Sequence, residues 1–234
     1  MRRWRARGLL ALAAWLALAA PAAAQQVVAA DYRQLMVQLG ERADFERLPP
    51  RREPGFNLDA PYRERGLWIG ERFAGQQAVA EGPRERLSGT PAAPLRLRTG
   101  AQRRNLSVAF HRGFGSNALF PLGADGFPRL TARGEGAVAL LFDSGQRAVG
   151  VRVHSGYPSP LGNRTGTGRV IFTFYDRAGK ALGRLEAKLH EGINEFGFRT
   201  AGSAPDIAGI TIENTDPGGI AIDDIIYSLP LLLG

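Results

Sequence analysis

Residues 169–190 read RVIFTFYDRAGKALGRLEAKLH, and this stretch decides the fold. In its first half Val170, Phe172 and Phe174 occupy every second position, and Leu185, Ala187 and Leu189 repeat that spacing in its second half. Such alternation turns one set of side chains into a core and the other toward solvent. The intervening DRAGK, residues 176–180, predicts a hairpin turn, with Gly179 suited to a positive φ. The stretch therefore predicts two antiparallel strands.

The same period of two recurs from about Gly66 to the end of the chain. Further strands are expected at residues 95–98, 106–111, 137–143, 149–153, 193–199, 207–214 and 220–227. Parallel α/β architecture needs crossover connections of a dozen or more residues, usually helical, and no helical spacing separates these runs. Many short strands joined by glycine-rich turns are typical of an all-β sandwich or barrel. We expect residues 66–234 to form one such antiparallel domain.

Residues 25–65 are expected to form a short N-terminal helix and a linker. Asp31 can cap a helix over residues 31–39, DYRQLMVQL, in which the apolar residues fall on one face. Residues 48–55, LPPRREPG, are rich in proline and charge, which favours a stiff turn region that ends the helix.

The first 24 residues have the order of a secretory signal peptide. Four arginines precede an apolar run over residues 8–20, and Ala22-Ala23-Ala24 supplies small residues at a cleavage site. An uncleaved membrane anchor is the alternative, but the run is shorter than the ~20 residues that cross a bilayer. We expect an exported protein, periplasmic or extracellular, with no membrane-spanning segment after cleavage.

Composition excludes several classes of function. Removal of the leader lowers the formal net charge from +8 to +4, and the remaining basic residues are interspersed with acidic ones. Nucleic-acid binding usually needs Lys and Arg clustered on one face, so it is not expected. The chain has no cysteine, which excludes disulfides, thiolate metal sites and a cysteine nucleophile.

The last strand carries a resemblance to a known fold family. Residues 218–227, GGIAIDDIIY, resemble the closing strand of jelly-roll domains of the galactose-binding-like type and are similar to the final strand of MAM domains. Residues 171–176, IFTFYD, and the entry GERFAG at residues 70–75 fit the same resemblance. It implies a jelly-roll β-sandwich with a carbohydrate or other extracellular ligand. It also implies a structural calcium ion held by Glu71 and Asp223, with Asp224 as a substitute.

The residues of this strand also allow another interpretation of its aspartates. Both of its faces are apolar, so at least one of Asp223 and Asp224 is expected to be partly buried. A buried carboxylate needs a cation or several hydrogen-bond donors. Backbone amides or arginines can meet that need as well as calcium can.

Two loops are suited to binding: residues 112–129, RGFGSNALFPLGADGFPR, with three phenylalanines among glycines and prolines, and residues 155–168, SGYPSPLGNRTGTG. The second has the side chains that sugar recognition favours. An aromatic ring, an amide and a guanidinium come together in Tyr157, Asn163 and Arg164, and His154 ends the strand before them. Functional residues concentrate on loops held by a rigid scaffold. The alternative is that these residues only turn the chain.

No motif predicts catalysis. His111, His154 and His190 lie on the polar side of their strands near the strand ends, but no local metal-binding spacing joins them. We expect a non-catalytic binding module for carbohydrate or a cell-envelope component, of unspecified oligomeric state. The alternatives are a structural or assembly protein of the cell surface and a hydrolase that uses two carboxylates.

Overall fold

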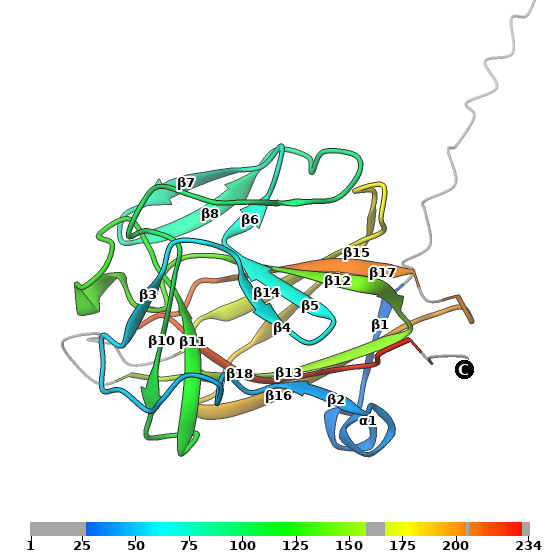
Figure 1. Ribbon diagram of the computed structural model, residues 1–234, viewed down its shortest axis with the longest axis horizontal. Coiled ribbons are helices and arrows are strands. Elements are labelled where there is room, and N and C mark those ends of the chain that lie inside the picture. Colours follow the sequence, from blue (N-terminus) through cyan, green and yellow to red (C-terminus); the bar gives the residue numbers. More distant parts are fainter. Residues whose placement is uncertain (1–26, 158–166, 205, 231–234) are drawn as a thin grey trace, which may run out of the picture.

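Two antiparallel sheets form the body of the computed structural model, which describes residues 27–157, 167–204 and 206–230 (Figure 1). The first sheet contains, in spatial order, β1 (Val27–Ala30), β16 (Gly192–Thr200), β13 (Ala148–Ser155), β18 (Ala221–Tyr227), β11 (Ser116–Pro121), β10 (Leu106–His111) and β3 (Phe56–Leu58), and β2 (Glu41–Ala43) pairs with β18. The second contains β15 (Ala181–Lys188), β14 (Arg169–Tyr175), β17 (Ile207–Asn214), β12 (Val138–Gln146), β5 (Leu67–Gly70) and β4 (Tyr62–Glu64).

Smaller elements lie outside these two sheets. The strands β7 (Gln77–Glu81) and β8 (Arg84–Ser88) form a hairpin, and β6 (Arg72–Phe73) pairs with β9 (Leu97–Arg98). A short 3₁₀ turn, η1, covers Leu130–Ala132. The β7–β8 hairpin is tied to the sandwich because the Leu87 amide donates to Glu213 at 2.7 Å.

The connections between the sheets are those of a jelly roll. Four strands follow the order β11-β18-β13-β16 in one sheet, and four follow β12-β17-β14-β15 in the other. Along the chain the strands pass from sheet to sheet, so that β18, near the end of the chain, lies between β13 and β11. Two facing sheets wound in this way form a jelly-roll sandwich. The expected all-β, antiparallel jelly-roll fold is confirmed.

The main hydrophobic core lies between the sheets and contains the residues that the alternation predicted to be buried. Val170, Phe172 and Phe174 of β14 are buried there and meet Val151 and Phe198 of the other sheet in the same apolar cluster. Side chains of one parity on each strand can reach the opposite sheet, which gives the core its two inner faces. The expected turn closes the β14–β15 hairpin, with a 3.0 Å bond from the Asp176 amide to the Lys180 carbonyl.

The expected N-terminal helix is present as α1 (Tyr32–Gln38) and covers the outer face of the first sheet. The Asp31 carboxylate accepts the Gln34 amide at 2.9 Å, as an N-cap does. Tyr32 and Leu35 are buried against Ile226, whereas Met36 is 45% exposed. The apolar stripe is therefore narrower than the sequence indicated, because two turns present only one row of side chains to the sheet.

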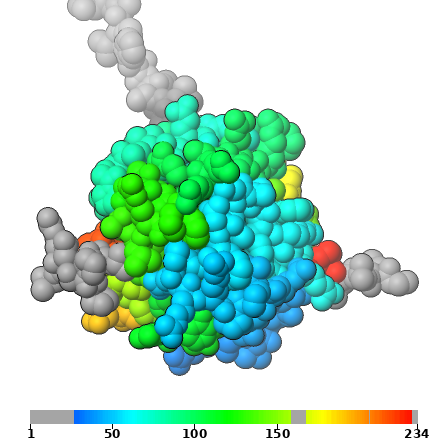
Figure 2. Space-filling model, turned by 60° about the vertical axis from the view of Figure 1, so that its left-hand side comes forward, coloured from blue at the N-terminus to red at the C-terminus, as the bar shows by residue number. Residues whose placement is uncertain are grey.

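The rest of the segment expected as a linker belongs to the sandwich. Its strands are β1, β2 and β3, which join the first sheet, and β4, which joins the second. Figure 2 shows this segment in blue and cyan as part of one continuous surface with the green residues that follow it. These strands have only three or four residues each, too few for an alternating pattern to be visible in the sequence.

A β-bulge in β18 explains why both faces of that strand are apolar. The pairing of β13 with β18 shifts register between Gly150 and Arg152, and Asp224 adopts a left-handed φ of 46°. An extra residue at a bulge reverses which side chains face the core. Before the bulge Ile222 points into the core, and after it Ile225 and Tyr227 do so.

The predicted signal peptide, residues 1–24, lies outside the described residues. In the described part of the chain, no helix has both the length and the apolar character needed to cross a membrane.

Candidate ligand-binding site

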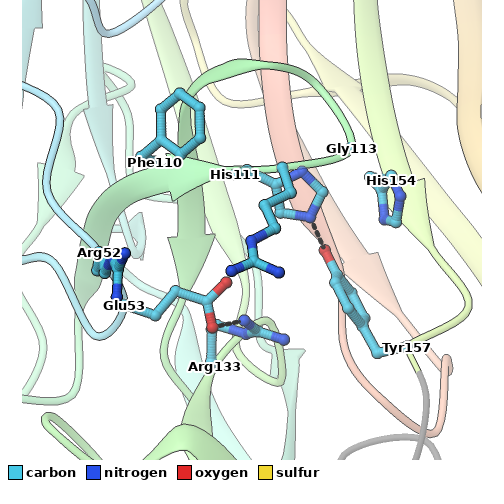
Figure 3. A pocket seen from close by; sticks show the side chains of 9 residues that line it. Arg52, Glu53, Phe110, His111, Gly113, Arg133, His154 and Tyr157 are labelled. Atoms are coloured by element: carbon cyan, nitrogen blue, oxygen red, sulfur yellow. Dashed lines mark hydrogen bonds and ion pairs between the residues drawn. The ribbon is translucent and has the colours of Figure 1, made fainter.

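A cavity of about 600 Å³ opens where the tip of the β10–β11 hairpin, the end of β13 and the segment before β3 meet (Figure 3). Its lining mixes guanidinium groups, imidazoles and aromatic rings: Arg52, Glu53, Phe110, His111, Arg112, Gly113, Arg133, His154 and Tyr157. Small-molecule sites are concave and join apolar surface to a few placed polar groups. We call this feature the histidine cavity.

His111 is buried at the centre of the cavity in one defined tautomer. Its Nδ1 accepts the Phe114 amide at 3.2 Å, so the ring proton lies on Nε2, which is 3.1 Å from the Tyr157 hydroxyl. Burial, together with the nearby His154, lowers the pKa of His111 to about 4. The imidazole is therefore neutral at pH 7, and the hydroxyl proton of Tyr157 is free to donate to another acceptor.

His154 lies beside His111, with the two ring centroids 4.4 Å apart. Burial lowers the pKa of His154, and the charge of Arg133 lowers it further. The backbone of Gly113 packs against both rings, since a Cβ atom there would lie 2.5 Å from Nε2 of His154 and 2.8 Å from Cε1 of His111. A glycine at this position allows the hairpin tip to approach both imidazoles.

Arg133 supplies a buried positive charge to the cavity. Its guanidinium carbon lies 4.6 Å from the centre of the Tyr157 ring and 5.1 Å from that of Phe120, and the group forms an ion pair with Glu53. Aromatic faces and a carboxylate are the partners that a desolvated guanidinium needs. Figure 3 shows the Glu53 carboxylate reaching Arg133 from the opposite side of the cavity to Tyr157.

Two polar atoms of the cluster are buried without a hydrogen-bond partner among the described residues. They are Nδ1 of His154 and Nε of Arg133. Buried polar atoms are usually satisfied, and exceptions concentrate where a protein has a role other than packing. Within the described residues, these two atoms are therefore available to a ligand in the cavity.

The structure brings together some of the residues that the sequence indicated. Tyr157 and His154 both line the cavity, whereas Asn163 and Arg164 lie outside the described residues. Sequence reasoning did not assign Glu53 or Arg133 to a site. Both come from segments without periodicity, and only the fold places them near the histidines.

Two of the three histidines meet, but the third does not join their ring cluster. His190 is exposed, and its carbonyl accepts the Ser155 hydroxyl at 2.8 Å. Within residues 27–157, 167–204 and 206–230, no group of three or more His, Cys, Asp or Glu side chains could hold a metal ion. The carboxylates of Glu71 and Asp223, the expected calcium ligands, contact different residues.

Glu71 is buried in an ion pair with Arg72 and has Glu85 and Arg104 nearby. Asp223 instead accepts the Ser116 hydroxyl at 2.6 Å and the Asp224 amide at 2.7 Å. These contacts are of the kind that the alternative expected, with an arginine, a hydroxyl and a backbone amide as partners, and calcium at these residues stays a prediction.

The surroundings of Asp224 also fit the interpretation in which arginines satisfy the carboxylate. Its carboxylate lies 2.8 Å from Arg152 and 3.3 Å from Arg42. The Asp224 carbonyl also accepts the Tyr32 hydroxyl at 3.0 Å, which ties α1 to the bulge.

Comparisons with protein-family models, with curated proteins and with solved structures found no match to this chain.

Proposed function

We propose that this protein is an exported, non-catalytic binding module that takes a saccharide into the histidine cavity. The observation that carries this proposal is the joining of an aromatic ring, a guanidinium and neutral imidazoles around one cavity of about 600 Å³. Sugars offer an apolar ring face and several hydroxyls, which such a lining can meet. The jelly-roll scaffold and the resemblance of the last strand to galactose-binding-like domains support the same class of ligand.

The polar groups in the cavity suit hydroxyl recognition. Tyr157 has a hydroxyl proton to donate, because its oxygen already accepts from Nε2 of His111. Phe110 is 36% exposed at the rim and offers an apolar surface. The buried side chains of His111 and Arg133 are already held in place, which reduces the entropic cost of binding at their side of the cavity.

The same lining argues against a hydrolase that uses two carboxylates. Such enzymes place two carboxyl groups roughly 5–10 Å apart on either side of the scissile bond. Glu53 is the one carboxylate among the described residues that line the cavity, and it is engaged by Arg133. The lining therefore does not favour the two-carboxylate alternative, and the proposal remains a binding module.

A glycan array followed by calorimetry on the purified full chain tests the proposal. Gly113→Ala places a methyl group against both imidazoles, so it is expected to reduce affinity at least tenfold while the protein stays folded. Gly40→Ala is the matched control, because a Cβ there meets no atom within 4 Å.

Three results would overturn the proposal. They are the absence of binding across neutral and acidic saccharides, equal binding by wild type and Gly113→Ala, and mass spectra that show cleavage of a bound oligosaccharide. Light scattering on the same sample tests the structural alternative, which requires self-association.

A further inference from the structure

The charges around the histidine cavity are unbalanced in favour of cations. Among the described residues, the guanidinium groups of Arg52, Arg112 and Arg133 line it together with one carboxylate, that of Glu53. Because Glu53 is paired with Arg133, the charge left over belongs to Arg52 and Arg112. Each of these two residues is exposed, and neither forms an ion pair with a carboxylate of the described residues.

The other titratable groups nearby do not cancel this excess. His111 and His154 are held in the neutral form by burial. Asp216 and Glu191 are close enough to influence His154 by their charges, but neither lines the cavity. The carboxylate oxygens of Asp216 also accept the amides of Gly168 and Gly218 at 3.1 Å each.

Two free guanidinium groups beside an aromatic rim suit one chemical class of sugar. A guanidinium presents parallel N–H donors that match the two oxygens of a carboxylate, and such charge-assisted pairs are stronger than neutral hydrogen bonds. Phe110, which lines the same cavity and is exposed at its rim, supplies surface for the ring that bears the carboxylate.

We propose that the ligand is an acidic saccharide that contains uronic acid, with its carboxylate at Arg52 and Arg112, its ring against Phe110 and one of its hydroxyls at the Tyr157 hydroxyl. This inference rests on the proposed saccharide-binding function and adds the charge of the ligand. Arg133 has a different role from the two exposed arginines. Its guanidinium is already paired with Glu53, and it lies over the face of the Tyr157 ring, which it holds in place.

The test compares each acidic oligosaccharide with its own methyl ester, which keeps the stereochemistry and removes the charge. Calorimetry on the full chain would use oligogalacturonate, oligomannuronate and oligoglucuronate. We expect at least one acid to bind at least tenfold more tightly than its ester. Raising NaCl from about 50 mM to about 500 mM should weaken binding of the acid and leave that of the ester unchanged.

Single substitutions then test which arginines bind the carboxylate of the ligand. Arg52→Gln and Arg112→Gln should each weaken binding of the acid roughly fivefold to tenfold, with little effect on the ester. Arg96→Gln is the matched control, since this arginine is also exposed and unpaired within the described chain but does not line the cavity. Thermal unfolding of all three variants checks that they are folded.

The outcomes separate this inference from the proposed function. Equal affinity for acid and ester, or binding of neutral saccharides alone, would overturn the acidic-ligand inference and leave a saccharide-binding cavity. Loss of binding with Arg96→Gln as large as with Arg52→Gln would also overturn it. Absence of binding by every saccharide, charged or neutral, would overturn both.

Discussion

The Tyr157 hydroxyl and Nε2 of His111 lie 3.1 Å apart, although 46 positions separate the two residues in the chain. One residue ends the first strand of the β10–β11 hairpin, and the other follows β13. Their contact connects the hairpin tip to the strand on which His154 lies. The histidine cavity is therefore assembled by the tertiary fold and not by any local motif.

Removal of that hydroxyl gives the first prediction. Tyr157→Phe keeps the ring against Arg133 but leaves Nε2–H of His111 without its acceptor, so stability should fall by about 1–2 kcal/mol. Saccharide affinity should fall as well, because the donor in the cavity is lost. Chemical denaturation and calorimetry measure the two effects, and an unchanged affinity would remove Tyr157 from the site.

The buried imidazole predicts a pH effect on stability. The pKa of His111 is lowered to about 4 in the folded protein, against an ordinary value near 6.5. Below about pH 6.5 the unfolded chain gains a proton that the folded protein does not, so stability falls until about pH 4. The stability advantage of wild type over His111→Gln should shrink by about 3 kcal/mol across this interval.

Urea denaturation at several pH values measures that difference, in which groups common to both proteins cancel. His190→Gln is the control, because its imidazole is exposed. A constant difference between wild type and His111→Gln would show that His111 does not titrate abnormally.

Glu135 predicts the opposite pH dependence. It is 4% exposed with Oε2 unpartnered among the described residues, and burial raises its pKa to about 8. As pH rises from about 4.5 to 8 the unfolded chain loses this proton first, so stability falls over that interval. Glu135→Gln mimics the protonated form and should stabilise the protein by about 3–5 kcal/mol near pH 9, with little effect near pH 5.

Thermal unfolding at both pH values tests this expectation. Glu81→Gln serves as the exposed counterpart. Destabilisation by Glu135→Gln at the higher pH would mean that the ionised carboxylate has a partner that the described residues do not supply.

The bulge in β18 gives a prediction about conformation. Asp224 has a φ of 46°, a region that Asp and Asn tolerate better than Ala does. Asp224→Asn should lose the ion pair with Arg152 at a cost of about 1–2 kcal/mol, and Asp224→Ala should lose roughly 1 kcal/mol more. Equal stability of the two variants would show that the left-handed backbone imposes no cost at this position.

Much of the fold could be predicted from the sequence because, in long strands, the alternation of apolar and polar residues indicates which side chains face the core. The β14–β15 hairpin and β17 lie where alternation or apolar runs indicated. The strand β18 was also predicted, at residues 220–227, although its parity reverses at Asp224. The short strands β1 to β4 were missed, because three or four residues cannot display a period. The strand β11 was missed because the glycines and prolines around it predicted a loop over residues 112–129.

The site was harder to predict than the fold. The positions of His111 and His154 on the polar side of their strands were visible in the sequence. Their approach to 4.4 Å was not, since it depends on how the hairpin tip lies against β13. In the sequence, Gly113 was the available indication of this approach, because a glycine between ring-bearing residues indicates close packing of the backbone. Nothing in the sequence around Glu53 and Arg133 indicated that they pair.

The position of β18 has a consequence for how the molecule folds. This strand, Ala221–Tyr227, lies between β13 and β11 and completes the middle of the first sheet. Without it, the β13–β16 pair and the β10–β11 pair have no common neighbour, so closure of the sheet depends on contacts between residues far apart in the sequence. We expect folding to be slow and the insertion of β18 between these two pairs to be a late step.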